Sequence, residues 1–217
     1  MSVKENLLKV KAQLPPEVTL VAVSKTKPIE LIKEAYEAGQ RDFGENYVQE
    51  LEEKHKQLPT DIRWHAIGHL QSNKVKYIAP FVHLIHGVDS FKLLQEINKQ
   101  ATKNNRVIDC LLQIHIAQEE TKFGFDLKEC EELMRSQQLK DLKNICVRGF
   151  MGMATNTENE EQIRKEFHSL KNLYDKIGGL SVLSIGMSSD MKIAIEEGST
   201  MVRVGSSIFG DRDYSKT

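Results

Sequence analysis

Residues 19–46 read TLVAVSKTKPIELIKEAYEAGQRDFGEN, and they contain a strand, a helix and a second strand in that order. The opening TLVAVSK is largely apolar and rich in valine, as expected of a buried strand. In PIELIKEAYEAG, one helical face carries Ile29, Ile32, Lys33 and Tyr36, and Gly39 ends the helix. RDFGEN supplies the next strand. This stretch therefore predicts a parallel strand–helix–strand unit.

The same alternation continues along the chain. Further strands are predicted at RWHAIGH (63–69), VHLIHGV (82–88), IDCLLQIHI (108–116), CVRGFMGMA (146–154), LSVLSIGM (180–187) and MVRVGSSIFG (201–210), with helical patterns between them. Eight such strands predict an α/β fold, a single (β/α)8 TIM barrel over residues 1–217, with an additional N-terminal helix near 3–14. The alternative is an open doubly wound sheet. It usually carries a glycine fingerprint after its first strand, and the sequence contains neither GxGxxG nor GxxxxGK[ST].

Composition excludes several classes of protein. The 217 residues suit one domain, and a formal net charge of −1 gives no general attraction to nucleic acid. No apolar run is long enough to cross a membrane, and the N-terminus lacks the apolar core of a signal peptide, so we expect a cytoplasmic location. Cys110, Cys130 and Cys146 lack CxxC spacing and are interpreted as reduced structural thiols. His65 and His69 lie too far apart on a strand for a helical metal motif, so no metal is expected.

In a parallel barrel, functional groups gather where strands end at the C-terminal face. The first strand delivers Lys25 there, and a lysine at the end of a buried strand is costly unless it is paired, neutralised or used covalently. The alternative is that Lys25 simply extends into solvent.

The far end of the sequence favours a functional role for this lysine. Ser188, Ser189 and Asp190 fall where a strand turns into a helix, and Gly205 follows the eighth strand with hydroxyls next to it, so both loops could hold a phosphate. An ordinary helix cap and a tight turn are the alternatives. Barrel closure places the eighth strand beside the first, so Lys25 and Arg203 would share this pocket. A lysine, a phosphate loop and a fixed arginine are the parts of a pyridoxal phosphate site.

Five stretches carry a family resemblance: VAVSKTKP, DFGENYVQE, WHAIGHLQSNK, ETKFGF and SIGMSSDMKIAIEEGSTMVRVGSSIFG. Along nearly its whole length the chain resembles the pyridoxal phosphate homeostasis protein family, which is similar to the N-terminal domain of alanine racemase. The resemblance implies that the chain binds pyridoxal 5′-phosphate through seven residues. Lys25 would form the Schiff base, with Asn46 and Met187 near the cofactor, Arg203 facing the pyridine nitrogen, and Ser188, Gly205 and Ser206 on the phosphate.

The resemblance also implies a role in vitamin B6 and amino-acid homeostasis, without robust catalysis. Arg203 would leave the ring nitrogen unprotonated, which makes the cofactor a poor electron sink. The catalytic tyrosine of alanine racemases comes from an additional domain, and Tyr47 is a weak substitute here. The alternative is a monomeric racemase or lyase with weak activity. We expect a monomer whose partners are the cofactor, pyridoxal phosphate-dependent apoenzymes and amino acids held as external aldimines. Three further lysines near strand ends, Lys27, Lys74 and Lys122, are interpreted as solvated loop charges. Of these, Lys122 could accept or relay the cofactor.

Overall fold

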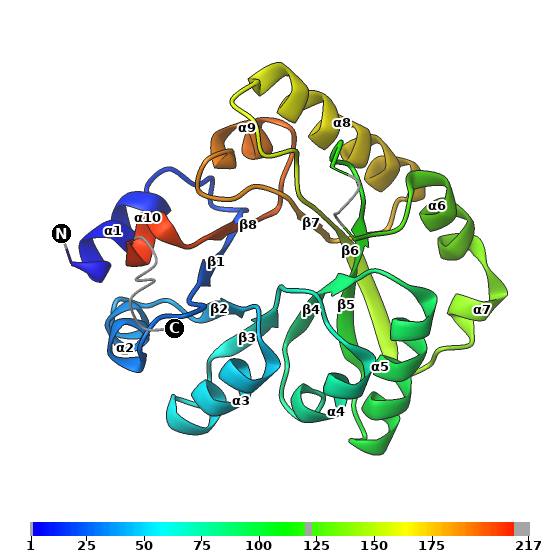
Figure 1. Cartoon of the computed structure of the whole chain (residues 1–217), viewed down its shortest axis with the longest axis horizontal. Coiled ribbons are helices and arrows are strands. Elements are labelled where there is room, and N and C mark those ends of the chain that lie inside the picture. The colour runs from blue at the N-terminus through cyan, green and yellow to red at the C-terminus, as the bar shows by residue number, and fades with distance from the viewer. Residues whose placement is uncertain (1, 120–122, 211–217) are drawn as a thin grey trace.

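A computed structural model of the chain describes residues 2–119 and 123–210, and it contains a closed barrel of eight parallel strands in chain order (Figure 1). The strands are β1 (Thr19–Val23), β2 (Asp42–Glu45), β3 (Arg63–Ala66), β4 (Leu84–Val88), β5 (Ile108–Ile114), β6 (Ile145–Gly152), β7 (Val182–Ser184) and β8 (Met201–Val204). The predicted (β/α)8 barrel is confirmed. Each strand lies inside its predicted segment, except that β6 begins one residue early.

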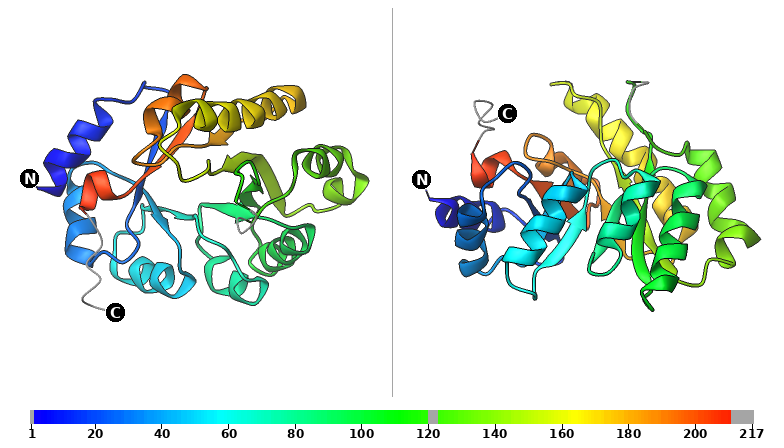
Figure 2. Two further views of the ribbon diagram at one scale, coloured as in Figure 1. Left: turned by 45° about the horizontal axis from the view of Figure 1, so that its top comes forward. Right: turned by 60° about the horizontal axis from the view of Figure 1, so that its bottom comes forward.

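Helices surround the barrel in both views of Figure 2. They are α2 (Ile29–Glu37), α3 (Val48–Gln57), the 3-10 helix η1 (Ser72–Lys74), α4 (Val75–Ile78), α5 (Phe91–Lys103), α6 (Leu127–Arg135), α7 (Gln137–Lys140), α8 (Glu160–Ile177), α9 (Met191–Glu196) and α10 (Ser206–Phe209). Within the described ranges, none of these helices has the length and apolar character needed to cross a lipid bilayer.

The predicted N-terminal helix is present as α1 (Val3–Lys11), three residues shorter than expected. Ser2 and Glu5 form a reciprocal capping box that fixes its first turn. The helix packs on the outside of the barrel against α2 and α10. The Asn6 side chain donates to the carbonyl of Ile208, in α10, at 3.1 Å. The first and last helices of the described chain are thereby joined.

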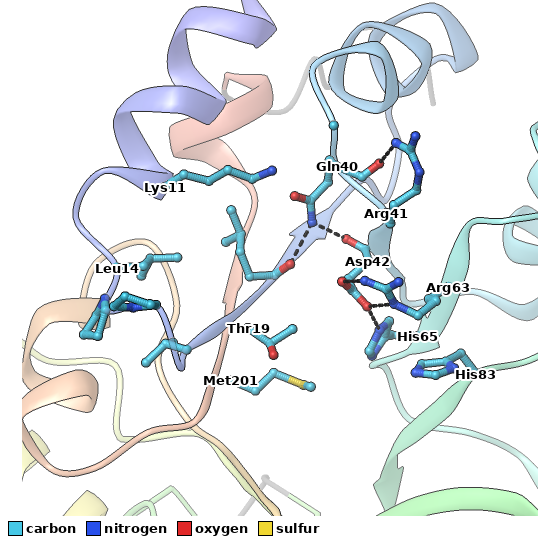
Figure 3. Close-up of a pocket in the computed structure, with 15 residues that line it drawn as sticks. Lys11, Leu14, Thr19, Gln40, Arg41, Asp42, Arg63, His65, His83 and Met201 are labelled. Carbon is cyan, nitrogen blue, oxygen red and sulfur yellow. Dashed lines mark hydrogen bonds and ion pairs between the residues drawn. The ribbon is translucent and has the colours of Figure 1, made fainter.

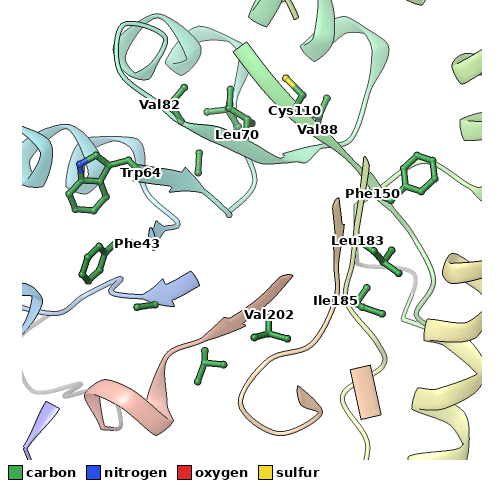
Figure 4. Packing of buried hydrophobic residues seen from close by; sticks show 14 of the residues in the cluster. Phe43, Trp64, Leu70, Val82, Val88, Cys110, Phe150, Leu183, Ile185 and Val202 are labelled. Atoms are coloured by element: carbon green, nitrogen blue, oxygen red, sulfur yellow. The ribbon is translucent and has the colours of Figure 1, made fainter. Parts of the chain in front are cut away.

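Two apolar clusters form the core. The larger lies mostly between the strands and the helices and includes Phe43 and Trp64, whose ring centroids are 6.0 Å apart (Figure 4). The smaller contains one buried residue from each of β1, β4, β5, β6 and β8, on the faces of those strands that point into the barrel: Val21, Leu84, Leu111, Met151 and Met201. Bulky apolar residues normally fill the inside of such barrels. Here they share it with buried polar side chains.

Candidate functional site at the C-terminal end of the barrel

A cavity of about 730 Å³ lies at the C-terminal ends of the strands. All seven residues predicted to bind the cofactor line it: Lys25, Asn46, Met187, Ser188, Arg203, Gly205 and Ser206. The residues come from β8 and from the segments that follow β1, β2, β7 and β8. Fold closure therefore brings together parts of the chain as far apart as Lys25 and Ser206, as the sequence predicted.

The turn that carries Lys25 begins where β1 ends. The Ser24 N–H donates to the carbonyl of Gly44 at 3.0 Å, which continues the pairing with β2, and the Lys27 N–H donates back to the Ser24 carbonyl at 3.0 Å. Thr26 has a φ of 61°, in the left-handed region that non-glycine residues rarely adopt. The Lys27 ammonium donates to the carbonyl of Gly210 at 2.9 Å. Lys25 is thus placed in the cavity wall by a tight, hydrogen-bonded turn.

A buried charge cluster between β2 and α3 holds the backbone of this turn. It was not predicted from the sequence. The Lys54 ammonium, on α3, donates to Glu45 at 2.8 Å, to Glu50 at 2.6 Å and to the Ser24 carbonyl at 2.8 Å. The Ser24 hydroxyl donates to the same Glu45 oxygen at 2.5 Å, and the Thr26 N–H donates to Glu50 at 2.6 Å. Burial raises the pKa of Glu45 to about 7. The cluster therefore holds the backbone on both sides of Lys25.

A sequence signal for this cluster exists. Lys54 follows the buried Leu51 by three residues, which places both on the face of α3 that points toward the barrel. A lysine on the inward face of a helix needs a buried acid, and Glu45, at the end of the preceding strand, supplies one.

The opposite side of the cavity is formed by the loops after β7 and β8. Pairing of β8 with β1, from Thr19 with Met201 to Ala22 with Val204, places these loops beside the Lys25 turn. Gly205 approaches β1 so closely that a Cβ there would lie 3.2 Å from the carbonyl oxygen of Val23. A side chain at this position would crowd β1, so the close packing of β8 on β1 favours glycine here.

The turn before α9 differs in one detail from the expectation. Ser188 does not cap the helix; Asp190 occupies the N-cap position, and its carboxylate accepts a hydrogen bond from the Met187 N–H at 2.6 Å. Ser188 and Ser189 are left on the cavity side of this turn, where they line the wall. The alternative interpretation of Ser188 as an ordinary cap is wrong.

Arg203 is 4% exposed, yet it lines the cavity. One terminal nitrogen donates to the Ser184 carbonyl and to the Ser184 hydroxyl, both at 2.7 Å, and the other donates to the Gly152 carbonyl at 3.1 Å. Burial lowers the pKa of Arg203 to about 10, so the guanidinium stays protonated at neutral pH. A guanidinium has five N–H groups. Three bind these acceptors, which leaves two without an acceptor among the described residues.

Behind Arg203, buried polar side chains form a hydrogen-bonded chain across the barrel, which we call the interior chain: Ser184, His86, His65 and Asp42. The Ser184 hydroxyl lies 3.1 Å from His86 Nδ1, and His86 Nε2 lies 2.9 Å from His65 Nδ1. His65 Nε2 lies 3.1 Å from Asp42, which also accepts from Arg63. The sequence ruled out a helical metal motif for His65 and His69 but gave no sign that His65 is linked to Arg203 through His86 and Ser184.

The remaining candidates are divided by the structure. Lys27 lines the cavity, Lys74 does not, and Lys122 lies outside the described residues. Tyr47 is 61% exposed and is not part of the wall, so it is a poor candidate for a second base. Wall residues that the sequence reasoning missed include His69, Gln113 and Phe123. His69 ends its predicted segment, so the strand-end rule could have found it, whereas Gln113 lies three residues before the end of its predicted segment.

The site combines the Lys25 amine, two loops that carry hydroxyl groups, and Arg203, two of whose N–H groups have no acceptor among the described residues. Hydroxyls and backbone N–H groups favour phosphate, whereas an amine at the end of a buried strand can attack a carbonyl carbon. A donor-only guanidinium suits a ring nitrogen that acts as an acceptor. These residues fit a phosphorylated, nitrogen-containing aromatic aldehyde.

Comparison with known proteins agrees with this chemistry. Residues 1–213 match the family model for the alanine racemase N-terminal domain. A pyridoxal phosphate homeostasis protein from Aquifex aeolicus is 43% identical, with 90% of this chain and 87% of that protein covered. PipY from Synechococcus elongatus is 35% identical, and the alignment covers 96% of this chain and all of PipY. Its TM-score is 0.91 for the structure without pyridoxal phosphate and 0.87 for the structure with pyridoxal phosphate bound.

Proposed function

The chain belongs to the pyridoxal phosphate homeostasis protein family of alanine racemase N-terminal domains, and we propose that it binds pyridoxal 5′-phosphate in the cavity at the C-terminal end of its barrel. Its role would be intracellular vitamin B6 and amino-acid homeostasis. The observation that carries the proposal is the meeting of Lys25, Arg203 and the two hydroxyl-bearing loops in one cavity.

Each wall residue has a distinct part in this proposal. Lys25 provides the amine that forms a Schiff base with the aldehyde, and the turn around Thr26 fixes where that amine enters. Ser188, Gly205 and Ser206 would hold the phosphate through hydroxyl and backbone N–H groups, with Asn46 near the cofactor and Met187 near its ring or phosphate. When bound, the cofactor supplies an electrophilic carbon that amines attack.

Arg203 favours a carrier over an enzyme. Its guanidinium donates hydrogen bonds and does not give up its proton at neutral pH, so a ring nitrogen that accepts from it stays unprotonated. Such a ring stabilises a neighbouring carbanion poorly. We therefore propose a protein that holds the reactive aldehyde and passes it to pyridoxal phosphate-dependent apoenzymes. A weak amino-acid racemase or lyase is the alternative.

Covalent attachment tests the cofactor site. Purified protein loaded with pyridoxal phosphate is expected to absorb in the visible range, to lose that band on borohydride treatment and to carry the reduced adduct on Lys25. Lys25→Ala removes both the band and the adduct, whereas Lys27→Ala, a change two residues away in the same turn, keeps them. An adduct at Lys27 in the native protein would refute the assignment.

Proton exchange tests the carrier role. With L-alanine in deuterated solvent, NMR is expected to show negligible α-deuterium incorporation and no D-alanine. Arg203→Glu, measured at matched cofactor occupancy, should exchange faster because a carboxylate lets the ring nitrogen take a proton. Turnover at enzyme-like rates in the native protein would establish the racemase alternative instead.

A further inference from the structure

A second cavity, of about 530 Å³, lies at the opposite end of the barrel. Its wall comes from the segment after α1 and from the N-terminal ends of β1, β2, β3 and β8, together with the residue before β4 (Figure 3). None of the residues proposed to hold the cofactor lines it. It is therefore a separate site from the one at the C-terminal end.

Three side chains in this wall present metal-ligating atoms to one another. Asp42 on β2, His65 on β3 and His83 just before β4 each offer one such atom, and these atoms all lie within 4.8 Å of one another. His65 Nε2 and Asp42 Oδ1 are 3.1 Å apart. Two ligands on a tetrahedral ion with bonds of 2.0–2.1 Å lie roughly 3.3 Å apart, so this pair already has nearly the spacing of a coordinated pair.

The backbone holds the three residues in place. β2 and β3 pair in register, with Gly44 opposite His65, and the His83 N–H donates to the Trp64 carbonyl at 2.9 Å. The His65 and His83 rings meet edge to face, with centroids 5.4 Å apart. His83 is the exposed member, so its ring can adjust at little cost. Ligands on neighbouring strands are better fixed than ligands on loops.

His65 also has the outer contact that is typical of a metal ligand. Its second ring nitrogen, Nδ1, lies 2.9 Å from His86 Nε2. A histidine that binds metal through one nitrogen almost always uses the other in a hydrogen bond that fixes the ring. His86 is fully buried inside the barrel, so it is held in position to form this hydrogen bond with His65.

We propose that Asp42, His65 and His83 form a binding site for a divalent transition-metal ion of the Zn²⁺ class. Two imidazoles and one carboxylate are a common donor set for such ions, and hard cations such as Mg²⁺ prefer oxygen ligands throughout. The cavity in front of the three residues leaves room for water or a small ligand at the remaining position. The proposal is independent of the cofactor site.

The positive charge of Arg63 should weaken metal binding, and this provides a specific test of the proposal. Its guanidinium pairs with both oxygens of Asp42, through Nε at 2.7 Å to Oδ1 and through a terminal nitrogen to Oδ2. It fixes the carboxylate, but its positive charge repels a cation held there. Removal of that charge should therefore strengthen metal binding, which a purely structural network would not predict.

A metal ion would reverse the direction of the hydrogen bonds along the interior chain. Without one, and with His65 neutral, His65 Nε2–H donates to Asp42, so His65 Nδ1 accepts from His86 Nε2–H, and His86 Nδ1 accepts from the Ser184 hydroxyl. A metal on His65 Nε2 leaves the proton on Nδ1, which must then donate to His86 Nε2. His86 would then carry its own proton on Nδ1.

Titration calorimetry with ZnCl2 on the intact protein tests the site. We expect saturable binding of one ion, weakened at least tenfold by His83→Ala and tightened by Arg63→Gln. His168→Ala is the matched control, because His168 forms another histidine–carboxylate pair, at 3.1 Å to Glu197, on the surface. Affinity that is lost in His168→Ala, or unchanged in His83→Ala, would overturn the proposal.

A second measurement does not depend on variants that could misfold. Nitrogen-15 NMR of histidine-labelled protein distinguishes the two neutral tautomers of His86. The proton is expected on Nε2 without Zn²⁺ and on Nδ1 with one equivalent. A His86 tautomer that does not change while calorimetry shows binding would place the ion elsewhere and would also overturn the proposal.

Discussion

The interior of this barrel has two polar regions with opposite character. At the C-terminal mouth, residues such as Lys25, Ser188 and Ser206 are half-buried or exposed and face a cavity of about 730 Å³. In the interior chain, His65, His86 and Ser184 are all 0% exposed and bind one another. Polar groups that face the mouth cavity are proposed to serve a ligand, whereas His86 and Ser184, which line neither cavity and hydrogen-bond each other, serve the fold. Substitutions in the two regions should therefore have different consequences.

The largest effect on stability is expected from His86→Leu. This change removes the middle of the interior chain and leaves a His65 nitrogen and the Ser184 hydroxyl buried without their partner. Each unsatisfied buried group costs roughly 1–3 kcal/mol, so the loss of two should lower the free energy of unfolding by about 2–6 kcal/mol, as measured by urea denaturation. His168→Ala, on the surface, should change it by less than about 0.5 kcal/mol. Equal stability of both variants would contradict the structural importance of the interior chain.

At the mouth the consequences should be reversed. Ser188→Ala is expected to weaken pyridoxal phosphate binding by roughly tenfold or more, because a hydrogen bond to a charged group contributes about 1.5–3 kcal/mol. The unfolding free energy of the protein without cofactor should stay within about 0.5 kcal/mol of the parent. Equilibrium titration and urea denaturation on the same samples measure both quantities. Unchanged cofactor affinity would remove Ser188 from the phosphate site, and a large loss of stability would erase the distinction between the two regions.

The mouth was predictable from the sequence because its residues follow one rule. Strands alternate with helices strongly enough to give all eight strands, and residues at the C-terminal strand ends then converge whatever their separation in the chain. Lys25 and Ser206 illustrate this, since only the closure of β1 on β8 brings them together. The same rule covers His69, which was considered only as a metal ligand, whereas Gln113 lies inside its predicted segment and reaches the cavity because β5 ends at Ile114.

The interior chain was not predictable in this way. The contact between His86 and Ser184 joins β4 to β7 across the barrel, and no sequence spacing encodes a contact across the lumen. A histidine within an apolar run is compatible with many partners, so the residue could be noticed while its partner could not. Asp42 and His83 likewise become neighbours of His65 only through the register of three strands.

The Lys25 turn faces the mouth cavity but is supported by buried polar groups. The pH dependence of stability tests the contribution of these buried groups. The turn belongs to the mouth, but it rests on the buried cluster of Glu45, Lys54 and Glu50. Burial raises the pKa of Glu45 from 4.5 to about 7. Between these two values the folded protein keeps a proton that the unfolded chain has released. The free energy of unfolding should therefore fall as pH rises through this interval. Above about pH 7, Glu45 should cause no further change in it.

Glu45→Gln tests that expectation with a side chain of the same shape that cannot ionise. Because one proton is involved, the stability of the parent relative to the variant should fall with rising pH by at most about 1.4 kcal/mol per pH unit. Urea denaturation of both proteins from pH 5 to pH 7.5 measures this difference, and pH effects from other groups cancel in it. Glu52→Gln is the control, since Glu52 pairs with Lys56 on the outer surface of α3, the helix that carries Lys54. Parallel curves for the parent and Glu45→Gln would mean that Glu45 is ionised throughout, held so by Lys54, and that the Lys25 turn rests on a fixed ion pair.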